Sequence, residues 1–337
     1  MAAKKILIVF TRDEEIKKNI KDTVLAVDEI KKALVAGGFE VEARCLTEED
    51  FKDVGRLKRK IFVKRPDCIF NLFEGFVDDS SKEIELVRII ESEGLPYTGN
   101  GSMALENCLD KAACKKILKE AGVSVPRGIF INKSGDFNLG DLAPPFFVKP
   151  CFEDASYGID EQCLVYEEKE LASVIERALE MFPRGIVVEE FIGGKEYHVG
   201  LLGEYPYELL GISTTDYSLY KDFKPFLTYK AKWDRNTPEY RRIMPSLIEP
   251  IEGQIENKLH ETASFCAKAL GCKGYLRVDI REKRGGFFVL DVNPNPDISV
   301  ESGFIKQAYQ KGYDYQKIIV KIVQLANIGP GETKCNR

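Results

Sequence analysis

Four residues near the C-terminal end of the chain have types and spacing suited to metal and phosphate chemistry: Arg277, Asp279, Asp291 and Asn293. They fall in two strand-like runs that flank a turn centred near Gly285, a pattern typical of a β-hairpin. Side chains alternate between the faces of a strand, so each run places two of the four on one face. The turn is then expected to set Asp279 opposite Asp291, and Arg277 opposite Asn293.

A divalent cation would relieve the repulsion between two facing carboxylates. Carboxylate and amide oxygens are hard ligands that suit Mg²⁺ or Mn²⁺, and a magnesium ion held by one or two carboxylates completes its shell with water and substrate phosphates. The same pattern also fits a solvated hairpin of alternating charge. The residues alone therefore leave a metal–phosphate site and an ordinary surface hairpin open.

The hairpin needs a core face, which six alternate residues are expected to supply: Leu276, Val278, Ile280, Phe288, Leu290 and Val292. It belongs to a predicted unit over residues 186–327, whose other elements are strands at 186–191, 196–202 and 208–214 and helices at 252–270 and 313–326. Residues 215–250 show no regular pattern, and a loop of that length is uncommon unless it covers a site or is disordered. Residues 328–337 are expected to form a loose tail.

Two further units precede this one. Residues 1–105 alternate between strands and helices, which predicts an α/β layer with strands at 5–10, 39–46 and 68–73 and helices at 23–36 and 80–93. Residues 106–185 predict a smaller unit with helices at 110–121 and 168–181 and strands near 128–131, 145–149 and 163–166. The predicted fold class is α/β, or α+β, in three parts.

The composition indicates a globular protein with more than one structural unit. The chain has 337 residues, of which 44% are hydrophobic, and it lacks an apolar run of the roughly 18 residues that a membrane helix needs. Its net charge is −5, and acidic and basic residues are mixed along the chain without the basic stripe of a nucleic-acid binder. Nine cysteines without a C-x-x-C pair disfavour a zinc ribbon or a secreted disulfide framework, and two histidines, His198 and His260, exclude H-E-x-x-H chemistry. A cytoplasmic protein is expected.

The hairpin ends in Asp291-Val-Asn-Pro-Asn-Pro296, which resembles the C-terminal metal-binding end of ATP-grasp carboxylate–amine ligases and above all of D-alanine–D-alanine ligases. Other segments resemble that family in the same order, over about residues 65–325: Leu95–Ala104 with Asp110-Lys111, Phe147–Pro150, Val188–Glu196 and Leu270–Asp279. The resemblance implies an ATP-grasp fold. Residues 1–105 would be an N-terminal α/β pre-ATP-grasp domain on the substrate side. Residues 106–185 would be the central ATP-grasp subdomain, and residues 186–327 the C-terminal one with the metal hairpin and a lid.

The resemblance also implies roles for individual residues. Lys111, Lys149 and Lys232 would reach the phosphates of ATP. Glu189 would accept the adenine amino group, backbone around Ile192 would read the adenine edge, and Glu196 would hold the ribose; Glu190 and Ser156 complete the ATP-binding set. Asp279, Asp291 and Asn293 would hold two ions of Mg²⁺ or Mn²⁺. Arg277 would stabilise the charge that develops during reaction, and Ser302 falls where the family has a carboxylate-binding serine. Each lysine and glutamate here is also a common surface residue.

The implied reaction is an ADP-forming ligation of an acid to an amino acid, of the EC 6.3.2 type. A carboxylate attacks the γ-phosphate of ATP to give an acyl phosphate, and an amine then displaces phosphate through a tetrahedral intermediate. Water must be excluded, so the stretch 215–250 would act as the lid. The expected partners are small amino-acid or carboxylate substrates, without nucleic acid or membrane, and a homodimer is expected by resemblance only.

The chain departs from the family where substrates are chosen. Asp154 stands where the family has a glycine in the loop after Lys149, and Ala155 stands where it has a serine. Asp297 replaces a glycine whose backbone helps to hold the acceptor carboxylate, and Trp233 matches a lid tyrosine. ATP use is therefore better supported than D-alanine as a substrate.

Several interpretations stay open at this point. The chain fits a D-alanine–D-alanine ligase-like enzyme, a ligase of the same fold for a different amino acid or amine, or a non-catalytic nucleotide-binding regulatory module. The segment Gly99–Ala104 also fits G-x-G-x-x-A, but it lies too far downstream for the first turn of an NAD-binding unit. His198 and Cys151 are expected to serve packing rather than catalysis.

Overall fold

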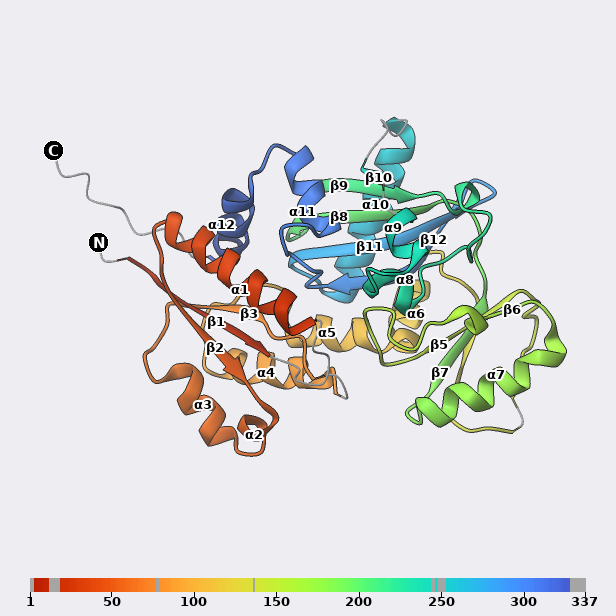
Figure 1. Ribbon diagram of the computed structural model, residues 1–337, viewed down its shortest axis with the longest axis horizontal. Coiled ribbons are helices and arrows are strands. Elements are labelled where there is room, and N and C mark those ends of the chain that lie inside the picture. The colour runs from red at the N-terminus through yellow and green to blue at the C-terminus, as the bar shows by residue number, and fades with distance from the viewer. Residues whose placement is uncertain are drawn as a thin grey trace.

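The protein is described by a computed structural model that covers residues 3–11, 19–76, 79–135, 137–243, 246–247 and 253–327. The predicted tail at 328–337 lies outside these residues. Figure 1 shows three units, each built on its own β-sheet, with the first unit at the left and the other two at the right. No helix within the described ranges combines the length and the hydrophobicity of a membrane span.

The first unit is a parallel three-stranded sheet in the order β2-β1-β3. Its strands are β1 (Lys5–Thr11), β2 (Glu40–Leu46) and β3 (Cys68–Leu72), and its helices are α1 (Asn19–Ala36), α2 (Glu48–Phe51), α3 (Val54–Phe62) and α4 (Ser81–Ser92). Helices α2 and α3 were not predicted. Helix α3 lies in the connection from β2 to β3, which crosses from one edge of the parallel sheet to the other and so cannot be a tight turn. The Asp53 side chain caps α3 by accepting from Gly55 N–H at 2.8 Å.

The second unit is an antiparallel sheet in the order β4-β7-β5-β6. Its elements are β4 (Gly128–Ile131), β5 (Phe146–Pro150), the 3-10 turn η1 (Glu161–Cys163), β6 (Leu164–Val165), α7 (Glu168–Met181) and β7 (Ile186–Glu190). Strand β7 pairs with both β4 and β5. A boundary after residue 190 therefore fits the pairing better than the expected boundary after residue 185, which separates β7 from its own sheet.

The third unit is a five-stranded antiparallel sheet in the order β10-β9-β8-β11-β12. Its strands are β8 (Glu196–Gly203), β9 (Glu208–Thr215), β10 (Ser246–Leu247), β11 (Gly274–Lys283) and β12 (Gly286–Pro294), and its helices are α10 (Gly253–Leu270), α11 (Gly303–Gln310) and α12 (Tyr315–Leu325). Helices α5 (Ser102–Leu109) and α6 (Lys111–Glu120) also pack against this unit, because Cys108, Cys114 and Leu118 belong to its core. Neither α5 nor α11 was predicted.

The stretch at 215–250 was expected to lack regular structure, and this expectation is wrong. It holds the 3-10 turn η2 (Tyr217–Leu219) and the short helices α8 (Tyr229–Trp233) and α9 (Pro238–Arg242). Thr228 and Thr237 cap the two helices with their side chains, accepting from Ala231 N–H and Tyr240 N–H. Residues 216–243 are called the lid below; residues 244–245 and 248–250 of the expected stretch lie outside the description.

The hairpin of β11 and β12 has the expected register. Asp279 lies opposite Asp291, and Arg277 lies opposite Asn293. The turn places Arg284 and Gly285 at positive φ angles of 53° and 76°, as a tight two-residue hairpin requires. Four polar groups are thereby brought to one face of adjacent strands.

A β-bulge changes which hydrophobic residues of β12 face the core. Leu290 is an extra residue in the pairing, because Ile280 pairs with Val289 directly after the bulge. As a result Val289 is buried and Phe287 packs beside it, so the expectation that Phe288 and Leu290 supply the core is wrong.

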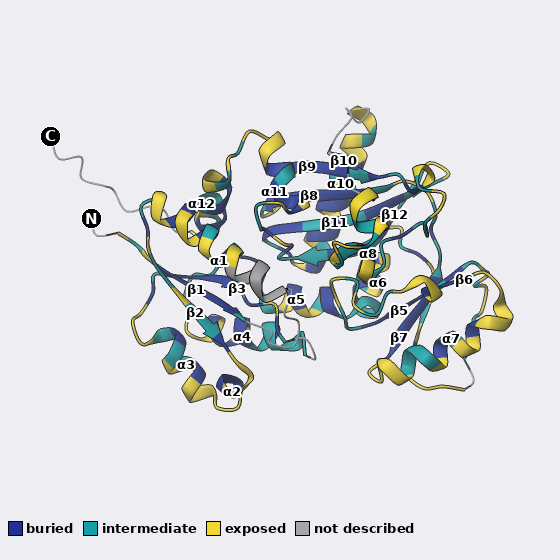
Figure 2. Cartoon of the chain, viewed as in Figure 1, coloured by how far each residue is buried: buried dark blue, intermediate teal, exposed yellow. Residues whose placement is uncertain are grey.

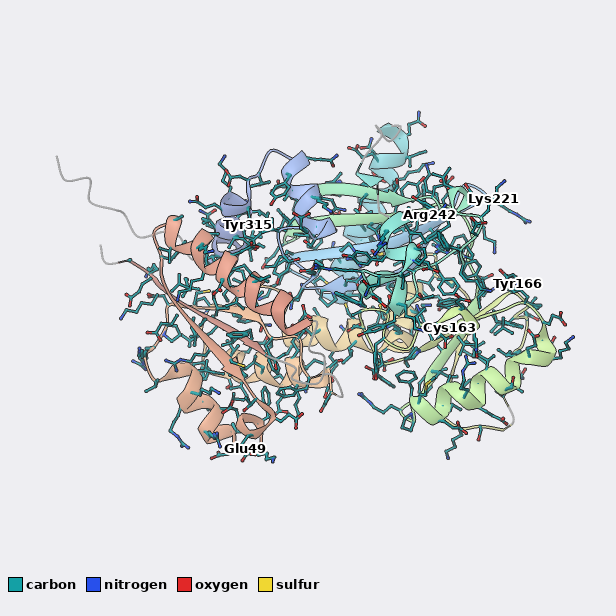
Figure 3. The ribbon with its side chains drawn as sticks, viewed as in Figure 1. Glu49, Cys163, Tyr166, Lys221, Arg242 and Tyr315 are labelled. Atoms are coloured by element: carbon teal, nitrogen blue, oxygen red, sulfur yellow. The ribbon has the colours of Figure 1, made fainter. Side chains whose placement is uncertain are left out.

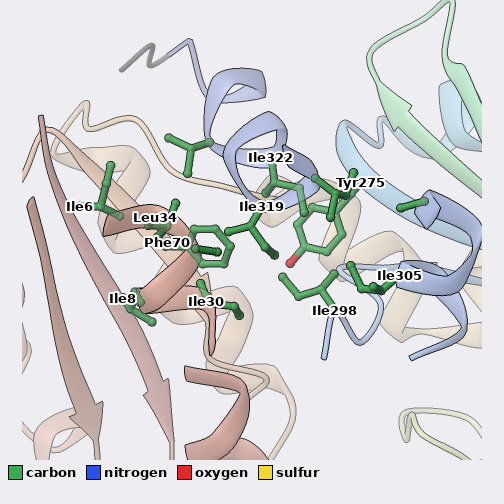
Figure 4. Packing of buried hydrophobic residues seen from close by; sticks show 14 of the residues in the cluster. Ile6, Ile8, Ile30, Leu34, Phe70, Tyr275, Ile298, Ile305, Ile319 and Ile322 are labelled. Atoms are coloured by element: carbon green, nitrogen blue, oxygen red, sulfur yellow. The ribbon is translucent and has the colours of Figure 1, made fainter. Parts of the chain in front are cut away.

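A shared hydrophobic core joins the first unit to the third. Helix α1 contributes Ile30 and Leu34, which lie in one cluster with Ile319 and Ile322 of α12 and with Tyr275 of β11 (Figure 4). Figure 2 shows the strands of the sheets largely buried, while the outer faces of α3, α7 and α10 are exposed. This packing places the C-terminal end of the β11–β12 hairpin directly beside the first unit.

A buried polar junction reinforces that contact. Asn295 accepts the backbone N–H of Asn100 at 2.8 Å and donates to Glu83 Oε1 at 2.8 Å. Asn100 in turn donates to the Tyr275 carbonyl at 3.0 Å. Gly99 has a φ of 88°, and a Cβ there would lie 2.3 Å from Asn295 Oδ1. The glycine of the G-x-G-x-x-A match is thus needed for close approach to the hairpin, not for a dinucleotide turn.

Candidate active site

The Asp279 carboxylate is surrounded by nitrogen donors. Arg277 binds it with two bonds, from Nε to Oδ1 at 2.7 Å and from Nη2 to Oδ2 at 2.9 Å. Asn293 Nδ2 donates to Oδ2 at 2.9 Å, and His198 Nδ1 lies 2.9 Å from Oδ1. Burial opposes the charged form, but Arg277 and His198 outweigh it and hold the pKa of Asp279 well below its usual range. Asp279 is therefore a fixed anion.

Asp291 is paired with a lysine from the neighbouring unit. Lys149, at the end of β5, lies 3.1 Å from Asp291 Oδ1 and 3.3 Å from Glu189 Oε1. Lys115 of α6 contacts the other oxygen of Glu189. Burial opposes the charged form of Asp291, but the lysines on β5 and α6 hold its pKa below the usual range. A chain of alternating charge therefore links the second sheet to the β11–β12 hairpin.

Burial and the neighbouring charge of Lys149 lower the pKa of Lys115 well below its usual value. Lys115 therefore loses its proton more easily than an ordinary lysine. It lies in the middle of α6, one turn after Lys111 and on the same face of the helix.

The loop at residues 151–158 carries the expected departures from the family. Lys111 Nζ donates to the Glu153 carbonyl and lies 3.3 Å from Asp154 Oδ1. Ala155 and Ser156 both have positive φ angles, 54° and 64°, a conformation that is uncommon for residues other than glycine. The loop is therefore tightly turned above α6, with Asp154 tied to Lys111.

The lid reaches this loop from the third unit. Trp233 donates from Nε1 to the Ala155 carbonyl at 2.9 Å, and Tyr229 N–H donates to the Ile159 carbonyl at 2.8 Å. Lys221 and Arg242, both labelled in Figure 3, belong to the same lid, and Arg242 stacks 5.0 Å from the ring of Phe223. The lid is thus closed onto the 151–158 loop.

Lys232 belongs to α8 of the lid. Burial and the nearby positive charge of Arg277 lower its pKa, while Asp279, Asp154 and Asp297 act in the opposite direction. These neighbours place Lys232 between the hairpin and the 151–158 loop, beside the residues expected to act on phosphate.

Glu196 lies at the connection between the second and third units. Arg281 donates to Glu196 Oε2 from Nε at 2.9 Å and from Nη2 at 2.7 Å. The same guanidinium donates to the carbonyls of Ile192 and Pro225, both at 2.7 Å, and stacks against Tyr217 at 4.9 Å. Arg281 therefore fastens residues 188–196 (the hinge between the second and third units), the base of the lid and strand β11 to one another.

Some predicted residues lie apart from this group. Glu190 points to the opposite face of β7 from Glu189 and accepts from Arg127 N–H at 3.0 Å. Ser302 accepts from Ile305 N–H at 3.3 Å and caps α11. Cys151 is fully buried, and burial raises the pKa of its thiol to about 11, which agrees with a packing role.

The other predicted residues come together between the second and third units: Lys111, Lys149, Ser156, Glu189, Ile192, Glu196, Lys232, Arg277, Asp279, Asp291 and Asn293. Three basic residues in this region were not predicted to take part, namely Lys115, Arg281 and His198. Lys115 follows Lys111 by one helical turn, and Arg281 continues the alternation of Arg277 and Asp279 on β11, so both had a periodic signal. His198 had the same signal, two residues after Glu196.

The donor set fits a hard divalent cation that is shared with a substrate. Within the described ranges, no three carboxylate, imidazole or thiol groups converge closely enough to hold a metal by themselves. Two carboxylates and an amide oxygen are nevertheless what Mg²⁺ uses when phosphates and water supply its other ligands. The repulsion expected between Asp279 and Asp291 is relieved here by Arg277, His198 and Lys149. Metal binding is thus chemically suitable but not required by the hairpin itself.

Known proteins resemble this chain in sequence and in fold. The family model described as the D-Ala–D-Ala ligase C-terminus matches residues 117–324, more than half of the chain. D-alanine–D-alanine ligase B of Chromobacterium violaceum is 31% identical, over 82% of this chain and 85% of that protein. D-alanine–D-alanine ligase A of Bacillus cereus is 30% identical, over 70% of this chain and 73% of its own length.

Solved structures share the fold over nearly the whole chain. The D-alanine–D-alanine ligase of Bacillus anthracis complexed with ATP superimposes with a TM-score of 0.76 at 23% identity, covering 96% of this chain and 98% of that one. The VanG D-Ala:D-Ser ligase of Enterococcus faecalis superimposes with a TM-score of 0.70 at 20% identity, covering 96% and 99%. From the family match, the sequence relatives and the shared fold, we conclude that the chain belongs to the D-alanine–D-alanine ligase family of ATP-grasp enzymes.

Proposed function

We propose that this protein is an ATP- and Mg²⁺-dependent, ADP-forming ligase that joins a carboxylate to the amine of an amino acid through an acyl phosphate. One observation carries the proposal. Two fixed carboxylates, Asp279 and Asp291, lie on adjacent strands beneath a closed lid, each bound to a basic side chain of a type that stabilises phosphate. In an ordinary surface hairpin, Asp291 would not be expected to pair with a buried lysine from another sheet.

Binding of ATP is assigned to the region between the second and third sheets. Lys149 and Lys111 lie where β5 and α6 meet the 151–158 loop, and as compact cations they suit phosphate oxygens. The resemblance of the hinge assigns the adenine to Glu189 and the backbone near Ile192, and the ribose to Glu196. Since Lys115 and Arg281 already contact these carboxylates, both side chains are oriented before the nucleotide arrives.

The metal would be held by Asp279, Asp291 and Asn293 together with phosphate oxygens. When bound, it neutralises phosphate charge during transfer to the substrate carboxylate. Arg277 lies beside these ligands and can stabilise the negative charge of the acyl phosphate and of the tetrahedral intermediate. The contacts of Trp233 and Tyr229 with the 151–158 loop exclude water from the acyl phosphate.

The substrates belong to the small amino-acid or carboxylate class. The relatives named above are D-alanine–D-alanine ligases, and one neighbour in fold is a D-Ala:D-Ser ligase, so the acceptor differs among proteins of this architecture. Asp154 and Asp297 add negative charge near Lys232. These acids favour an acceptor other than D-alanine as the second candidate.

Phosphate release with ATP, Mg²⁺ and defined amino-acid pools tests the proposal. We expect at least one pool to support turnover. Asp291→Ala should abolish this turnover and leave the fold unchanged, as judged by the circular dichroism spectrum. Val54→Ala, an exposed substitution in the first unit, is the control and should keep full activity. Near-normal phosphate release by the Asp291 variant would overturn the metal assignment. ATP binding without turnover on any pool would favour a regulatory module.

We further place the protein in the cytoplasm, where ATP is available and where its eight described free cysteines would remain reduced. A homodimer is the assembly that the family resemblance implies. Sedimentation equilibrium would decide between a monomer and a dimer.

A further inference from the structure

His198 lies between the two carboxylates assigned to metal and ribose. It faces Asp279 across the β8–β11 pairing, and its Nδ1 lies 2.9 Å from Asp279 Oδ1. Its Nε2 lies 3.7 Å from Glu196 Oε1 and 3.5 Å from Thr215 Oγ1. The imidazole is buried, with 8% of the residue exposed. The buried ring therefore contacts the site and is held in place by its surroundings.

The other donors to Asp279 have different work in the proposed reaction. Asn293 Nδ2 now donates to Asp279 Oδ2, but as a metal ligand Asn293 must present its carbonyl oxygen instead. Arg277 occupies both oxygens, yet it is assigned to the charge that develops on the substrate. Only His198 among these three donors has no second assignment. It can hold Oδ1 throughout the reaction while Oδ2 turns to the ion.

We propose that His198 is a positioning residue: its Nδ1–H holds Oδ1 of Asp279 and so orients the carboxylate for the metal. This inference deepens the proposed function and rests on its metal site. Thr215 supports the required tautomer, because its hydroxyl can donate to an unprotonated Nε2 and leave the proton on Nδ1. Hydrogen bonds that orient metal ligands in this way typically change metal affinity by about 10–100-fold when removed.

Two substitutions of similar size separate the two ring nitrogens. His198→Asn places an amide N–H near the position of Nδ1 and can still donate to Asp279. His198→Gln places its amide near the position of Nε2, where it reaches Glu196 and Thr215 instead. The chain's other histidine gives the control: His260 of α10 contacts the Tyr207 carbonyl at 3.1 Å, and His260→Gln leaves the hairpin untouched.

Mn²⁺ titration of each full-length protein with a non-hydrolysable ATP analogue, followed by electron paramagnetic resonance of free Mn²⁺, measures the effect without turnover. We expect His198→Gln to weaken Mn²⁺ binding by about 10–100-fold, and His198→Asn to stay within about threefold of wild type. His260→Gln should bind like wild type. Melting temperatures, recorded in parallel, show whether the variants are folded.

Equal Mn²⁺ affinity of the two His198 variants, or weaker binding by Asn than by Gln, would overturn the positioning role. A fall in melting temperature with unchanged Mn²⁺ affinity would assign His198 to packing. Failure of the wild-type protein to bind Mn²⁺ in the presence of nucleotide would instead refute the metal site itself, so the two failures are distinguishable.

Discussion

Most carboxylates of the candidate site are bound to basic side chains that the proposed reaction requires for other purposes. Lys149 holds Asp291, Arg277 holds Asp279, and Lys111 contacts Asp154. Because the charges are already paired, the site costs less to build than a set of unpaired buried ions. When the nucleotide and its metal bind, they must replace these pairings between carboxylates and basic side chains. They do not enter a site whose charges are unpaired.

Glu83 provides a pH test at the residue scale. Burial, aided by the negative charges of Glu74 and Asp154, raises the pKa of Glu83 from 4.5 to about 8, although Asn295 and Asn71 donate to it. Between these pH values the folded protein binds a proton that the unfolded chain has lost. The contribution of Glu83 therefore favours folding at low pH and declines as the pH rises toward 8.

We expect Glu83→Gln to remove this decline. The variant keeps an acceptor for Asn295 but has no proton to lose, so its free energy of unfolding should exceed that of wild type at pH 8 and match it near pH 4.5. The difference should grow by at most roughly 1.4 kcal/mol per pH unit between these limits. Urea unfolding at a series of pH values measures it, and parallel pH curves for the two proteins would contradict the prediction.

At this scale the sequence predicted the hairpin residues well, for a physical reason. Period 2 and one turn determine which of Arg277, Asp279, Asp291 and Asn293 face one another, and all four are close in the chain. The partners of these residues were harder to predict, because His198 and Lys149 come from other strands. A single sequence does not state which strands will be neighbours.

The lid is a short-helix element whose contacts suit it to exclude water. Trp233 is 37% exposed, and its N–H bonds the Ala155 carbonyl in a loop turned by two positive φ angles. Trp233→Phe keeps the ring but removes this bond. We expect more phosphate released per amide bond formed, because an opened lid admits water to the acyl phosphate.

Comparing released phosphate with product, in the pool that supports turnover, measures this coupling. The free energy of unfolding should change by no more than about 1 kcal/mol, since one partly exposed hydrogen bond is lost. Tyr205→Phe, at an exposed position in the β8–β9 turn, serves as the control. An unchanged ratio of phosphate to product in Trp233→Phe would show that this bond does not close the site.

The predicted boundaries were right for elements with many helical turns. They were wrong for strands whose pairing partners lie far away along the chain. Helix α7 begins and ends at the predicted residues, Glu168 and Met181. Strand β7 was assigned to the wrong unit, because α7 and further elements separate it along the chain from its partners β4 and β5. The bulge at Leu290 left no signal in the alternation of β12. Helices α2, α8 and α9 have only four or five residues, too few to show a helical period.

The packing of the whole molecule protects its thiols. Of the eight cysteines in the described ranges, Cys45 alone is partly exposed. Burial raises the pKa of Cys68, Cys114 and Cys163 to about 12. Since the thiolate is the reactive form, these groups are both hidden and protonated at neutral pH.

We therefore expect iodoacetamide at pH 8 to modify Cys45 far faster than Cys68, Cys114, Cys151 or Cys163. Peptide mass spectrometry at timed intervals, with protein unfolded in urea as the control for full reactivity, measures the rates. Rapid modification of Cys151 would contradict this expectation and show that the 151–158 loop separates from α6 in solution.

The asparagine pair between the first and third units has a consequence for how small molecules enter. Asn295 follows the proposed metal ligand Asn293 by two residues and is hydrogen-bonded to Asn100 and Glu83. Swinging the first unit outward would pull on the hairpin and disturb the ligand itself. We therefore expect small molecules to enter at the lid, where Trp233 and Tyr229 of α8 donate hydrogen bonds to the carbonyls of Ala155 and Ile159. Lifting α8 would then accompany the entry of substrates and the exit of products.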